Sequence, residues 1–73
     1  MQYEIFAAGE RCAYFDSMVA SLQHAGIDAK QIAIADYDRL AGYVPEVHPR
    51  GTEVYVLVPT DQTVAAREIL KSQ

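Results

Sequence analysis

The chain has 73 residues, a formal net charge of −4 and a single cysteine, and these facts limit what it can be. A chain of this length forms one domain, so we expect residues 1–73 to make a single ferredoxin-like fold. The six basic residues are scattered through an acidic chain, whereas nucleic-acid binding needs clustered Lys and Arg, so we expect no nucleic-acid partner. The sequence lacks signal-peptide features, a pair of cysteines and any apolar run of about 18 residues. These absences favour a cytoplasmic location without membrane contact.

The first half of the sequence predicts a strand, a helix and a second strand. Residues 2–8 alternate as a strand does, with Tyr3 and Ile5 on one face. From about residue 11 apolar side chains recur at helical steps, and Gly26 suits the left-handed position just after a helix. A strand over residues 29–37 is expected to follow, with Ile32 and Ile34 on one face. The apolar stripe of the helix consists of Cys12, Phe15, Met18, Val19 and Leu22.

The second half predicts a strand and a helix after a less regular stretch. A short helical turn is expected over residues 36–42, capped by Asp36 or Asp38. Valines alternate in the strand that follows, and Pro59 ends it. Thr60 or Asp61 is expected to cap the last helix, over residues 64–71, whose buried side would be Val64, Ala65, Ile69 and Leu70.

The order of these elements favours an α+β fold of the ferredoxin-like kind, β-α-β-β-α. In that arrangement a three-stranded antiparallel sheet carries both helices on one face. The fourth strand of the complete fold has no counterpart, because the chain ends three residues after Leu70. We therefore expect an open edge at the first strand, a homodimer formed with a second copy, or a protein partner bound through this edge and the 36–51 segment.

The segment "YVPEVHPRG", residues 43–51, holds most of the candidate binding groups. Its two prolines stiffen the backbone, and Gly51 allows a turn into the next strand. Two interpretations are open: a hairpin connector with solvated charges, which we favour, or a presented loop that binds an anion or an acidic partner. The candidate ligand- or partner-binding residues are Tyr43, Glu46, His48, Arg50 and Arg39, with Tyr37 as a further flat contact.

No catalytic, metal or cofactor site is predicted. The spacings of His, Cys, Asp and Glu match no known metal-ligand pattern. Cys12 opens a helix, where a thiolate would be favoured, but its place on the apolar stripe favours a packing role. An enzyme that uses Cys12, or His48 with Glu46 as an acid–base pair, is the least favoured alternative, and we expect no enzymatic activity.

Two stretches of the sequence resemble a known family. "MVASLQHAGIDAKQ" resembles its helix with an Ala-Gly-Ile step into a strand, and "GTEVYVLVPTDQTVAAREIL" resembles its valine strand, Val-Pro step and final helix. The family contains small bacterial proteins of unknown function that are classed as signal-transducing, and its members look like the nitrogen-regulatory PII proteins in fold. The sequence departs from it at Tyr14 and Phe15, where a Glu-Ala pair is usual, and in its longer middle segment.

The resemblance and the missing catalytic residues together favour a regulatory protein. Our leading hypothesis is a small non-catalytic regulatory or adaptor domain that acts in signal transduction by binding another protein. The alternative is a sensor of PII type, in which a nucleotide or another anion contacts Arg39, His48 and Arg50.

Overall fold

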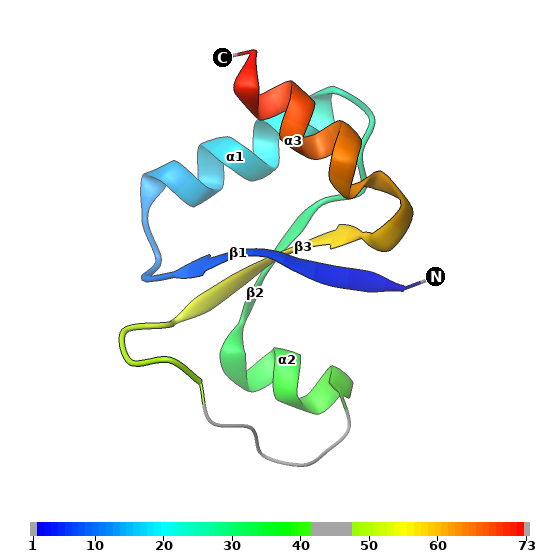
Figure 1. Cartoon of the computed structure of the whole chain (residues 1–73). Helices are drawn as coiled ribbons and strands as arrows, with labels where there is room; N and C mark the ends of the chain where they lie inside the picture. The colour runs from blue at the N-terminus through cyan, green and yellow to red at the C-terminus, as the bar shows by residue number, and fades with distance from the viewer. Residues whose placement is uncertain (1, 42–47, 73) are drawn as a thin grey trace.

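The computed structural model describes residues 2–41 and 48–72. Over these residues an antiparallel sheet lies between helices on its two faces (Figure 1). The helices α1 and α3 share one face, and α2 lies on the other. In chain order the elements are β1 (Tyr3–Gly9), α1 (Ala13–His24), β2 (Lys30–Ala33), α2 (Ile34–Ala41), β3 (Val54–Pro59), a 3₁₀ turn (Thr60–Gln62) and α3 (Thr63–Lys71).

The sheet has the strand order β1-β3-β2, with both pairs antiparallel. The predicted α+β class and three-stranded antiparallel sheet are therefore confirmed, and within residues 2–41 and 48–72 β1 is an edge strand, as expected. The pairing shifts between Ile5 and Ala7, so that Phe6 forms a bulge. Phe6 and Ala7 both pack against the core, which a regular alternation would not allow.

The region after β2 differs from the prediction, and the β-α-β-β-α order with two helices is not confirmed. Instead of a strand to residue 37 and one helical turn, β2 ends at Ala33 and a full helix begins at Ile34. The amide of Ile34 still donates to the carbonyl of Glu53, and the chain turns away from the sheet there. Asp36 and Asp38 consequently lie inside α2 and do not cap it.

The core lies between the sheet and the pair α1 and α3. Val54, Val56 and Val58 are completely buried there, as their alternation predicts. Tyr55 and Leu57 point to the opposite face and are also buried, so β3 is covered on both sides. The other buried members of the core are Phe15, Met18, Leu22, Ile27, Ala29 and Ala66.

Three predictions near the helix ends are wrong. Cys12 is exposed and lies just before α1, because the helix begins later than the apolar pattern suggested. No side chain caps α3, and its capping position is Gln62. The buried side of α3 is centred on Ala66, with Ile69 and Leu70 half-buried, which leaves Val64 and Ala65 exposed.

The end of α1 follows its prediction. Gly26 has a φ of 91°. The amide of Ile27 donates to the carbonyl of Leu22 at 2.9 Å, and the amide of Gly26 donates to the carbonyl of Gln23 at 3.0 Å. These two bonds form a Schellman motif, in which the buried Ile27 folds back onto the last turn.

Replacing Gly26 by alanine is expected to lower the free energy of unfolding by about 1 kcal/mol, because a β-carbon is strained in the left-handed region. No atom lies within 4 Å of the position that this carbon would take, so the cost comes from the backbone alone. Gly26→Asn should cost less, since asparagine tolerates this conformation. Urea unfolding of the two variants measures the difference, and equal losses would contradict a backbone origin.

Candidate functional site

His48 joins α2 to the central strand on the sheet face that α1 and α3 leave open. Its Nδ1 atom lies 2.5 Å from the hydroxyl of Tyr55. Its Nε2 atom lies 2.9 and 3.1 Å from the two carboxylate oxygens of Asp38. The ring of Tyr37 meets that of Tyr55 edge-on at 4.9 Å. We call these four residues, Tyr37, Asp38, His48 and Tyr55, the His48 cluster.

The hydrogen bonds of the cluster define the role of each group. An ionised carboxylate only accepts, so Nε2 of His48 donates to Asp38. In a neutral imidazole Nδ1 then accepts the hydroxyl proton of Tyr55. An aspartate that orients a histidine also occurs in catalytic triads, but here the tyrosine beyond the histidine is 5% exposed. The cluster is thus built to hold α2 and the chain after residue 47 against β3.

Of the five predicted binding residues the structure describes His48, Arg39 and Arg50, and these three make no hydrogen bond or ion pair with one another. His48 has an 11% exposed side chain with both ring nitrogens engaged. Arg39 is exposed and pairs with Asp36 one turn earlier in α2. Arg50 is exposed. The predictions for Tyr43 and Glu46 lie outside the described residues.

The outer edge of β1 is the second feature with binding potential. Within the described part of the chain, β1 has one neighbouring strand, β3. The amide of Thr60 donates to the carbonyl of Gln2, so residue 2 faces β3. Backbone groups alternate in direction along an antiparallel strand, so Glu4 also faces β3, while Tyr3 and Ile5 direct their N–H and C=O groups outward.

Tyr3 fixes the N-terminal part of this edge. Its hydroxyl donates to the carboxylate of Asp28, and the ammonium group of Lys30 lies 4.3 Å from its ring centroid. The hydrogen bond to Asp28 raises the pKa of Tyr3, with smaller contributions from desolvation and from the charge of Asp28. A raised phenol pKa means that this contribution to stability is complete below the ordinary value of 10.0 and is lost as pH rises through the higher folded value.

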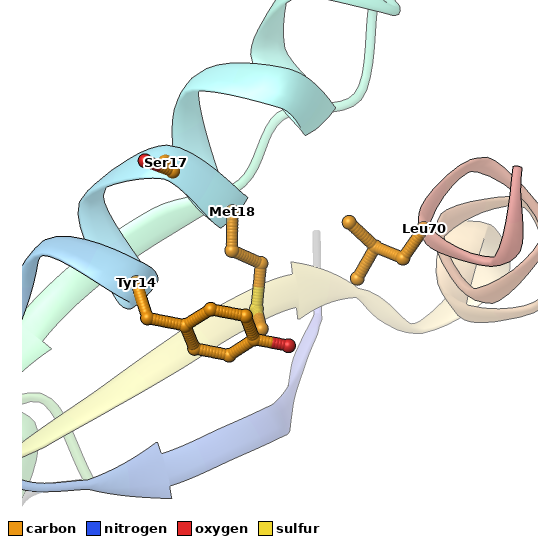
Figure 2. A pocket seen from close by; sticks show the side chains of 4 residues that line it. All are labelled: Tyr14, Ser17, Met18 and Leu70. Carbon is orange, nitrogen blue, oxygen red and sulfur yellow. The ribbon is translucent and has the colours of Figure 1, made fainter. Parts of the chain in front are cut away.

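A pocket of about 220 Å³ lies between α1 and α3. Figure 2 shows Tyr14, Ser17 and Met18 of α1 on one side and Leu70 of α3 on the other. Met18 belongs to the core cluster, and both Leu70 and Phe6 of β1 pack against it. The guanidinium of Arg67, one turn before Leu70, lies 6.0 Å from the ring centroid of Phe6. The pocket therefore lies on the same face of the sheet as Phe6, the bulge residue of β1.

The sequence did not predict the partners of His48 or the pocket. Tyr55 is embedded among valines, which indicates a strand position but not a hydrogen bond to a histidine. Asp38 follows Ile34 by four residues, so the helical period of α2 was the signal that could have placed it toward the sheet.

Neither a metal site, nor a membrane span, nor a known relative assigns a role to the described residues. In residues 2–41 and 48–72, no three His, Cys, Asp or Glu side chains gather to hold a metal ion. No helix in the described ranges is long and apolar enough to cross a membrane. No family model, curated protein or solved structure matches the chain, so the family resemblance stays a prediction.

Proposed function

We propose that the chain is a small non-catalytic domain of the regulatory or adaptor kind, which binds another protein in a signalling process in the cytoplasm. The observation that carries this proposal is the outer edge of β1, where Tyr3 and Ile5 offer backbone donors and acceptors. An extended segment of a partner would pair with these groups as an additional strand. A homodimer formed through the same edge is the competing prediction, because a second copy and a partner strand cannot occupy this edge at the same time.

The fold supports a finer assignment within the same proposal. Strand β3 lies between β1 and β2, and α1 and α3 cover one face, as in the ferredoxin-like folds of PII type. Helix α2 would then be an addition to that plan. The single exposed thiol of Cys12 suits a reducing compartment.

The alternative of an anion sensor has less support. A sensor would need donors that converge on one ligand, and both ring nitrogens of His48 are engaged inside the protein. Arg39 is paired with Asp36. A binding site for an anion would have to be built mainly from Arg50, and an Arg50→Ala variant with unchanged anion affinity would exclude it.

Replacing Ile5 by proline is expected to abolish partner binding and leave the fold intact. The N–H of Ile5 faces away from β3, so proline removes a donor from the outer edge without removing a bond of the sheet. The measurement compares the proteins captured by immobilised wild type and variant, with circular dichroism to verify the fold.

The matched control is Ile5→Ala, which removes the half-exposed side chain and keeps the N–H. Proteins that bind through the edge should be captured by the wild type and by this control, but not by Ile5→Pro. If Ile5→Pro captures the same proteins as the wild type, the edge of β1 is not the binding surface.

A further inference from the structure

Two side chains of β1, Glu4 and Phe6, point to the face of the sheet on which the α1–α3 pocket lies. Glu4 pairs with Val58, and directly paired residues project to one face, so the side chain of Glu4 is on the face that carries α1 and α3. Phe6, on the same face, packs against the core cluster that contains the pocket residue Met18, and the pocket residue Leu70 packs against the same cluster. A strand added beside β1 would therefore project alternate side chains toward Glu4 and toward the pocket.

The pocket has the size and lining for one large apolar side chain. An apolar cavity of about 150 Å³ holds a benzene ring, and this pocket measures about 220 Å³. Tyr14, Met18 and Leu70 provide apolar walls, and in Figure 2 the ring of Tyr14 and the side chain of Leu70 flank that of Met18. Tyr14 is 68% exposed, so a partner would cover surface that this chain leaves open to solvent.

Charge distinguishes a foreign strand from a second copy. Two copies of β1 can pair as antiparallel strands through the outward backbone groups of Tyr3 and Ile5. Tyr3 of one copy then pairs with Ile5 of the other, and the two Glu4 side chains lie directly opposite each other. Like charges in that position are destabilising, whereas a Lys or Arg there would be stabilising. The net charge of −4 adds to the preference for a basic partner.

We propose that β1 and the α1–α3 pocket form one site for an extended segment of a different protein, which adds an antiparallel strand to β1. This segment carries a basic residue opposite Glu4 and, two positions before it, a large apolar residue that enters the pocket. The proposal rests on the function proposed above and specifies the chemistry of the partner. Backbone pairing supplies the general affinity, and the pocket and Glu4 supply the specificity.

The test uses a fluorescently labelled peptide of eight residues. It consists of threonine and serine, apart from one lysine and a phenylalanine two positions before it. The full chain is titrated into this peptide, and fluorescence anisotropy measures binding. Replacing the phenylalanine by alanine is expected to weaken binding at least about tenfold. Ser17→Trp, which fills the pocket, should have the same effect, and Ala20→Trp, on the exposed part of α1, should have none. Glu4→Lys should weaken binding about fivefold, and a peptide with glutamate in place of lysine should restore it.

The variants separate this inference from the proposed function. If Ile5→Pro abolishes binding but Ser17→Trp and Glu4→Lys do not change it, the edge binds strands and the inferred chemistry is wrong. If Ile5→Pro also has no effect, both proposals fail. If the phenylalanine–lysine peptide does not bind, the inference is overturned. It is also overturned if the wild type sediments as a dimer and Ile5→Pro sediments as a monomer, because a second copy would then occupy the edge.

Discussion

Replacing His48 by alanine is expected to lower the free energy of unfolding by about 2–3 kcal/mol. The side chain is 11% exposed and hydrogen-bonds both Asp38 and Tyr55, so its removal takes one partner from each and leaves a gap beside two rings. A chain of 73 residues has a stability of about 4–11 kcal/mol in total, so this loss is a large fraction. Thermal unfolding should show a midpoint lower by about 10 °C or more.

The matched control for this experiment is His24→Ala, the same change at the exposed last residue of α1. There the expected loss is below about 1 kcal/mol, because only an interaction with the helix dipole is removed. Equal losses at the two histidines would show that the His48 cluster does not stabilise the fold. If His48→Ala has the same free energy of unfolding as the wild type but no longer binds an anion that the wild type binds, the sensor alternative is favoured.

The helix α2 shows where sequence patterns reach their limit. The stretch from Lys30 alternates apolar and small residues as a strand would, and Ile32 and Ile34 fit one face of a sheet. The same residues fit a helix, since Ile34, Tyr37 and Asp38 fall on one side at helical spacing. The choice depends on β3 and on the cluster around His48, which are distant in sequence, and no local pattern contains that information.

Strand β3 and the end of α1 were predictable for a different reason. Valines at every second position specify a buried face of β3 whatever lies above it, and Gly26 specifies the end of α1 through its own backbone. Cys12 was misplaced because an apolar period does not define where a helix begins. The sequence predicted His48 as a binding residue but not its bonds to Asp38 and Tyr55, because these two residues come from other elements.

Leu22→Ala is expected to cost about 3 kcal/mol, since Leu22 is completely buried in the core and a truncated leucine leaves a cavity. Its carbonyl also accepts the amide of Ile27, so a collapse of α1 toward the cavity would disturb the end of the helix. The free energy of unfolding in urea measures the loss. The control is Leu40→Ala, the same change at a side chain that is 69% exposed in α2, where we expect less than about 0.5 kcal/mol. A cost at Leu40 as large as that at Leu22 would mean that this end of α2 is covered, for example by a second copy of the chain, and that the surface seen in one chain is not the surface in solution.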